Sequence, residues 1–163
     1  MEHQTAGPAW AVALEASGLG EAMRSSAVLY PAANVIHVIA VLLLVGPIVA
    51  LDLRLLGFAR GIDAAALDRY LTRFAYGALP VIAVTGFALF SADATALAGN
   101  VAFRAKLLLA AAGLANAVVF RVIWRRRLPS WGTGPPLLGR AQPAASVLIW
   151  LAAVASGRLI AYL

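Results

Sequence analysis

The chain has no cysteine and only 12% charged residues. The absence of cysteine excludes disulfides, thiolate metal sites and cysteine nucleophiles. The chain also lacks a phosphate-binding loop, a zinc-protease HExxH motif and a serine nucleophile elbow. These absences argue against soluble-enzyme chemistry. They leave open whether the chain is an enzyme, and an enzymatic role would be at most that of a redox membrane subunit.

Apolar residues are abundant where charged ones are few. Of the 163 residues, 63% are hydrophobic, whereas a typical soluble chain is about half apolar and about a quarter charged. This composition indicates an integral membrane protein. The net charge of +6 does not indicate nucleic-acid binding, because the arginines gather at the ends of apolar segments, where a topology signal explains them.

Four apolar stretches are long enough to cross a membrane, because a hydrocarbon core of about 30 Å needs about 20 helical residues. We expect these spans at about residues 30–53, 74–91, 104–124 and 144–162. Residues 10–26 set apolar side chains against charged ones, which predicts an amphipathic helix in the interface. The predicted fold is all-α: an integral membrane four-helix bundle with an N-terminal interfacial amphipathic helix, forming a single transmembrane domain over residues 1–163.

Lysine and arginine are unequally divided between the two sides of these spans. The side reached after spans one and three holds nine: Arg54, Arg60, Arg69, Arg73, Arg121, Arg125, Arg126, Arg127 and Arg140. The other side holds Arg24, Arg104, Lys106 and Arg158. Basic residues favour the cytoplasm, so we expect a multi-pass protein of the bacterial inner membrane with both termini on the periplasmic side. The Pro- and Gly-rich segment Arg125–Gln142 is predicted to be an irregular cytoplasmic connection.

His37 is the only strongly polar side chain between Val35 and Leu51. A buried ionisable group is costly in a membrane unless it faces protein or water. At about 100° per residue, Asn34 and Asp52 share an azimuth and His37 lies about 60° away, so the three should form a polar stripe facing the bundle. Neutral imidazole can ligate haem or copper, or hydrogen-bond to a quinone. The alternative is a hydrogen bond to a neighbouring helix that only specifies packing.

Further candidates for an outward-facing site lie near the same end of the predicted bundle. Three are basic residues at the outer ends of spans three and four: Arg104, Lys106 and Arg158. Each could hold a haem propionate or a lipid phosphate, or snorkel to headgroups. The only other histidine, His3, can wrap Cu(II) with the N-terminal amine, and the thioethers of Met1 and Met23 suit Cu(I). No other span contains a histidine, so a bis-histidine haem b lacks its second ligand.

A second polar cluster is expected at the cytoplasmic side. Its predicted members are Asp52, Arg73, Asn116 and Arg121. Asp52 and Arg54 point about 160° apart on one helix and should not pair with each other. We expect Asp52 to meet Arg73 or Arg121 in a structural ion-pair cluster rather than a proton relay, and Asn116 to form an interhelical hydrogen bond.

Short motifs occur along nearly the whole chain. They are E-A-S-x-L-G (Glu15 to Gly20), Tyr30-Pro31, Asn34 to His37, Gly46, DLRLLG (Asp52 to Gly57), Thr85-Gly86, N-x-A-F-R-x-K (Asn100 to Lys106), Asn116 and G-R-L-I-A (Gly157 to Ala161). Together they resemble an uncharacterised family of small four-helix bacterial inner-membrane proteins. The resemblance implies the same bundle and carries no assigned activity. Members of that family often have a histidine where this chain has Arg121.

A second, more distant resemblance covers about half the chain. The helix from His37 to Gly46, Arg73-Phe74 with Thr85-Gly86, and Lys106-Leu107 with Asn116 are similar to the membrane domain of copper-resistance D proteins, which are grouped with b561-type cytochromes. This resemblance implies copper handling or transmembrane electron transfer, with His37 as the matching ligand.

Three functional hypotheses follow from these patterns. The first is an outward-facing haem, copper or quinone site at His37 that supports electron transfer or copper handling. The second is a non-catalytic membrane subunit or scaffold of a larger complex, whose polar residues only specify helix packing. The third is a transporter, whose four short spans would need to dimerise to enclose a path. The expected partners are the lipid bilayer and a larger membrane complex or a second copy of the chain, and no nucleic acid.

Overall fold

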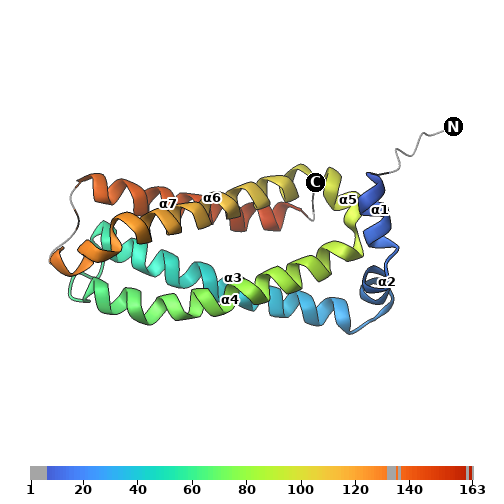
Figure 1. The fold of residues 1–163 in the computed structure, drawn as a ribbon, viewed down its shortest axis with the longest axis horizontal. Helices are drawn as coiled ribbons and strands as arrows, with labels where there is room; N and C mark the ends of the chain where they lie inside the picture. The colour runs from blue at the N-terminus through green and yellow to red at the C-terminus, as the bar shows by residue number, and fades with distance from the viewer. Residues whose placement is uncertain (1–6, 132–134, 136, 161, 163) are drawn as a thin grey trace.

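The computed structural model describes residues 7–131, 135, 137–160 and 162, and this part of the chain is all-helical, without a strand. Four long helices follow the long axis: α3 (Leu29–Leu56), α4 (Ala64–Ala92), α6 (Val101–Ile123) and α7 (Leu137–Leu159) (Figure 1). The short helices α1 (Ala9–Glu15), α2 (Gly18–Ser25) and α5 (Ala94–Gly99) lie at one end, and the 3-10 helix η1 (Arg125–Ser130) lies at the other.

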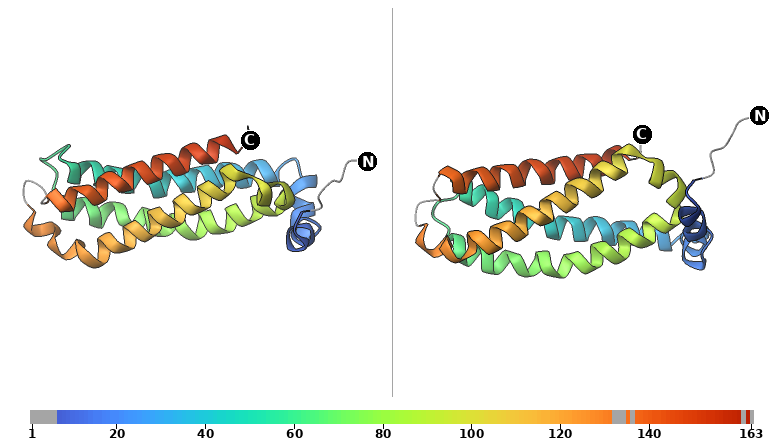
Figure 2. Two further views of the ribbon diagram at one scale, coloured as in Figure 1. Left: turned by 90° about the horizontal axis from the view of Figure 1, so that it is seen from above. Right: turned by 45° about the horizontal axis from the view of Figure 1, so that its top comes forward.

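The long helices lie side by side in pairs. α3 packs along α4, α6 packs along α7, and α3 also packs along α7, as the further views in Figure 2 show. Trp150 of α7 lies at the centre of the apolar core with Ala40, Leu44 and Ala78. The Trp150 ring fits over Gly113 of α6, where an added Cβ would lie 2.7 Å from the ring. Small residues therefore set the close approach of α6 and α7.

Among the described residues, α3, α4 and α6 are each long and apolar enough to cross a membrane. Large apolar side chains are exposed on all four long helices, including Leu42, Val84, Leu108, Val122 and Leu148. Within the described ranges, the buried polar and charged residues are His37, Asp52, Arg54, Asp68, Ser91 and Ser146. Ionisable side chains are seldom fully buried in soluble proteins, yet His37, Asp52, Arg54 and Asp68 are buried here beside a mostly apolar core.

Local signals define where several helices begin and end. The Asp63 carboxylate accepts a hydrogen bond from the Ala66 N–H at 2.6 Å, and α4 begins directly after this cap. The Asn100 side chain caps α6 in the same way, accepting from the Phe103 N–H at 2.9 Å. Helix α3 ends at Gly57, whose φ of 111° is in the left-handed region that favours glycine.

The prediction of an irregular connection over Arg125–Gln142 is wrong within the described residues. Residues 125–130 form η1, and α7 already begins at Leu137, with Pro143 inside it. Proline removes one backbone hydrogen bond from a helix and usually interrupts it. Pro143 is fully buried among the long helices, so tertiary packing outweighs its local preference here.

Candidate functional site

His37 of α3 is buried and faces α4. Its Nδ1 lies 2.9 Å from Oγ1 of Thr85, and the Thr85 hydroxyl donates to the Val81 carbonyl at 2.6 Å. Because the single hydroxyl proton is used on Val81, Oγ1 is left to accept, and Nδ1 must carry the donated proton. In the neutral ring Nε2 is then the acceptor nitrogen, and the backbone carbonyl of Ile82 also accepts a hydrogen bond from the ring.

The His37 ring also contacts a glycine and lies near a cation. A Cβ added at Gly86 would lie 3.1 Å from Cε1 of His37, so the ring packs directly on the α4 backbone. Lys106 of α6 is close enough for its charge to act on His37, and its side chain runs past Gly157 of α7. The structure therefore brings together His37 and Lys106, two of the predicted site residues.

The other residues predicted for the outward-facing site do not join them. Asn34 is exposed, so the prediction of a three-residue stripe facing the bundle is wrong at this position. Arg104 donates to the Ala98 carbonyl at 2.9 Å, and Arg158 donates to the Tyr162 hydroxyl at 2.9 Å. His3 and Met1 lie outside the described residues.

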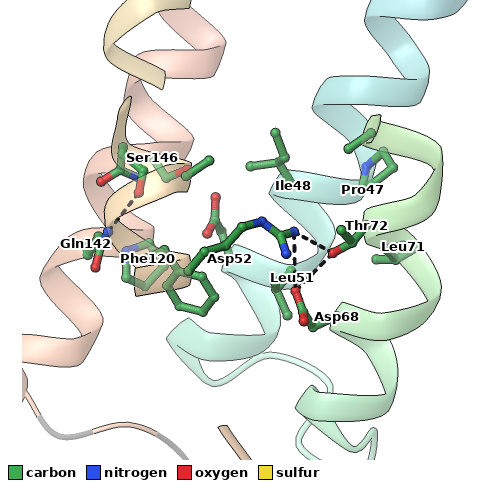
Figure 3. A pocket seen from close by; sticks show the side chains of 15 residues that line it. Pro47, Ile48, Leu51, Asp52, Asp68, Leu71, Thr72, Phe120, Gln142 and Ser146 are labelled. Atoms are coloured by element: carbon green, nitrogen blue, oxygen red, sulfur yellow. Dashed lines mark hydrogen bonds and ion pairs between the residues drawn. The ribbon is translucent and has the colours of Figure 1, made fainter. Parts of the chain in front are cut away.

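A small cavity of about 50 Å³, lined by both polar and apolar side chains, lies between the four long helices, nearer the η1 end. Its polar lining comes from every one of them: Asp52 of α3, Asp68 and Thr72 of α4, Asn116 and Arg121 of α6, and Gln142 and Ser146 of α7. Asp52 lies between the Ser146–Gln142 side and the Asp68–Thr72 side (Figure 3). Pro47 and Pro143 also line the cavity, so two of its helices lack a backbone donor at this level.

Asp68 holds the ion pairs of this cavity. Its carboxylate lies 3.2 Å from Nε of Arg125 and 3.8 Å from Nη2 of Arg121. The Thr72 hydroxyl donates to Asp68 at 3.0 Å and accepts from Arg121 Nη2 at 2.7 Å. Sequence reasoning missed Asp68, because it lies in a charged segment ahead of the expected second span. Its spacing of four from Thr72 was the available signal, since residues four apart share a helix face.

Asp52 is only 7% exposed, and among the described residues it forms no ion pair. The Ser146 hydroxyl forms a hydrogen bond with its carboxylate. Among the described residues, Asp52 Oδ2 and Arg121 Nη1 are buried without a hydrogen-bond partner. Arg121 therefore shares the cavity with Asp52 but pairs with Asp68.

The remaining members of the predicted cytoplasmic cluster make other contacts. Arg73 lies over the Tyr70 ring at 4.1 Å, and the structure does not bring it to Asp52. The backbone carbonyl of Asn116 accepts from Gln142 Nε2 at 3.0 Å, which links α6 to α7. Arg54 points away from Asp52, as predicted, and donates to the Arg60 and Ile62 carbonyls.

At the opposite end, α1 and α2 are fixed to the α4–α5 corner. The Glu15 carboxylate accepts from the Thr95 hydroxyl at 2.6 Å and from the Thr95 N–H at 3.0 Å. These two hydrogen bonds hold the pKa of Glu15 below its usual value, and the charge of Arg24 acts in the same direction. Arg24 itself donates to the Ala92 carbonyl at 3.2 Å. The amphipathic segment is thus held in place by polar contacts.

Comparisons with protein-family models, curated proteins and solved structures found no match for this chain. In the part of the chain that the structure describes, the fold is all-helical with three membrane-length helices, which expose large apolar side chains and bury a few ionisable ones.

Proposed function

We propose that the chain is an integral protein of the bacterial inner membrane, built as a four-helix bundle in which α7 is the fourth span. The exposed apolar side chains on all four long helices support this proposal, because lipid is their natural solvent. The excess of arginine at the η1 end supports a cytoplasmic location for that end. The α1–α2 end, where α7 also finishes, would then face the periplasm (Figure 1).

Within this membrane bundle, we propose that the chain is a non-catalytic subunit or scaffold of a larger membrane assembly. The observation that carries the proposal is the contact of His37 with Thr85 and Gly86. The one ionisable side chain in the middle of α3 is used to join α3 to α4. Asp68 similarly joins α4 to α6 and η1. Interhelical hydrogen bonds of this kind specify helix packing within a membrane.

Haem and copper do not fit the residues at His37. Of the two histidines, only His37 lies within the described residues, and the positive charge of Lys106 that acts on it also disfavours a metal cation. Among the described residues, no group of three or more His, Cys, Asp or Glu side chains could hold a metal ion. We therefore derive no chemistry through either group.

A second candidate function, binding of a quinol headgroup, is favoured by the tautomer of His37. Since Nδ1 donates to Thr85, the neutral ring has no second proton to offer a quinone carbonyl. Its Nε2 lone pair suits a hydroxyl donor, which a quinol supplies. Lys106 offers donors for another ligand oxygen nearby.

Purification from membranes in a mild detergent separates these proposals. A structural subunit is expected to be colourless and metal-free and to co-purify with a partner subunit or a second copy, captured by cross-linking before solubilisation. Quinol bound in proportion to protein, lost in His37→Ala and kept in the exposed control Asn34→Ala, would favour the second candidate. A Soret band or stoichiometric copper in the purified protein that disappears in His37→Ala would contradict our conclusion that haem and copper do not fit at His37.

A further inference from the structure

The cavity beside Asp52 has the size and the chemistry to hold water. Its volume is about 50 Å³, and a buried water needs about 10–15 Å³ of such volume, which leaves room for about three to five. A buried water also needs at least two polar partners. Asp52 Oδ2 supplies an unpaired acceptor, and Arg121 Nη1 supplies an unpaired donor. Water is thus the natural bridge between these two atoms.

The surrounding charges distinguish Asp52 from Asp68. Asp68 is neutralised by Arg121 and Arg125, so protonating it would break two ion pairs. Asp52 faces Asp68 and Thr72 on α4, Arg121 on α6, and neutral side chains on α7. The Ser146 hydroxyl is its hydrogen-bond partner. Protonation of Asp52 breaks no direct ion pair, so Asp52 is the carboxylate of this cavity that is free to exchange a proton.

We propose that Asp52, Arg121 and the water between them form a proton-binding site inside the bundle. A hydronium ion in the cavity transfers its proton to Oδ2, where an O–H bond forms and a water molecule remains. The Arg121 guanidinium stabilises the ionised carboxylate through the bridging water. The site lies at the arginine-rich end, so its protons come from the side that we assign to the cytoplasm. This binding goes beyond the structural role proposed above.

Labelling with dicyclohexylcarbodiimide tests the site, because this reagent modifies protonated carboxyl groups in apolar surroundings. In the full chain in detergent, mass spectrometry is expected to find an adduct on the peptide that contains Asp52, increasing as the pH is lowered. Asp52→Asn removes the adduct, whereas Asp93→Asn, at an exposed aspartate, keeps it. An unlabelled Asp52 at every pH, or labelling that does not vary with pH, would overturn the proposal.

Two further variants test the role of Arg121 and guard against misfolding. Arg121→Gln removes the cation that stabilises the carboxylate, so labelling of Asp52 at neutral pH is expected to rise several-fold. Unchanged labelling would exclude the water-bridged pair. Asp52→Glu keeps a carboxyl group in the cavity and is expected to remain labelled at position 52. This variant decides the outcome if Asp52→Asn does not fold, and absence of its label would count against the site.

Discussion

The imidazole of His37 and the hydroxyl of Thr85 join α3 to α4 through a bond of 2.9 Å whose direction is fixed by a third group, the Val81 carbonyl. Thr85 donates along its own helix and accepts across the interface. In the membrane location that we propose, no water is available to replace that acceptor. The bond therefore specifies both the rotation of α3 against α4 and the tautomer of the histidine.

Thr85→Val is expected to destabilise the bundle, because valine keeps the volume of threonine but removes the acceptor of the His37 Nδ1–H. A buried polar group left without its partner costs about 1–3 kcal/mol. Thr85→Ser retains the hydroxyl and should lose much less. Thermal unfolding in detergent, followed by circular dichroism, measures the difference, and equal melting temperatures for the two variants would contradict a structural role for this bond.

Asp68→Asn is expected to be more damaging, because the carboxylate is 3% exposed and pairs with two arginines. Breaking a buried ion pair costs about 3–5 kcal/mol. Arg125 is half-exposed and can return to water, so we expect a loss at or just below the lower end of that range, about 2–3 kcal/mol. Arg126→Gln, an exposed neighbour of Arg125, is the control and should change the free energy of unfolding by less than about 0.5 kcal/mol. The same unfolding measurement applies.

Long apolar runs predicted the membrane-length helices α3, α4 and α6, because segment length and hydropathy are local properties. The early start of α4 was not predicted. Its first turns carry charged residues that resemble a loop, and only the Asp63 cap marks the boundary. The start of α7 was hidden for a similar reason, since Pro143 indicates a break that burial outweighs.

For the candidate sites, too, the sequence predicted which residues face inward but not which partners they meet. Helical periodicity predicted that His37 and Asp52 face inward, and both are buried. Their partners were not predictable, since Thr85 lies 48 residues beyond His37 in sequence and the fold alone brings it there. The geometry of the cavity likewise depends on side chains from four helices, which no local pattern encodes.

Gly113→Ala tests the close approach of α6 and α7. An added Cβ would lie 2.7 Å from Cε2 of Trp150, and Trp150 is buried in the core, so the helices must separate. Overpacking of this kind costs about 1–3 kcal/mol. Gly46→Ala is the matched control, since nothing lies within 4 Å of its added Cβ. Alanine favours helix over glycine by about 1 kcal/mol, so the control should melt at the same or a higher temperature. A Gly113→Ala variant that melts with the control would contradict this packing.

The contact between Glu15 and Thr95 predicts a pH dependence for the N-terminal helices. The Thr95 hydrogen bonds lower the pKa of Glu15 in the folded state, so the ionised carboxylate is the form that the fold stabilises. The contribution is fully present above the usual glutamate pKa and is lost as the pH falls through the lowered value. Backbone hydrogen exchange in α1 and α2 should therefore accelerate on acidification, beyond the intrinsic change in exchange rate, while exchange in the core of α3 is unaffected. Thr95→Val removes the hydroxyl, the larger cause of the lowered pKa, and should move the transition to higher pH. A transition that is unchanged in Thr95→Val would show that another group holds α1 and α2 in place.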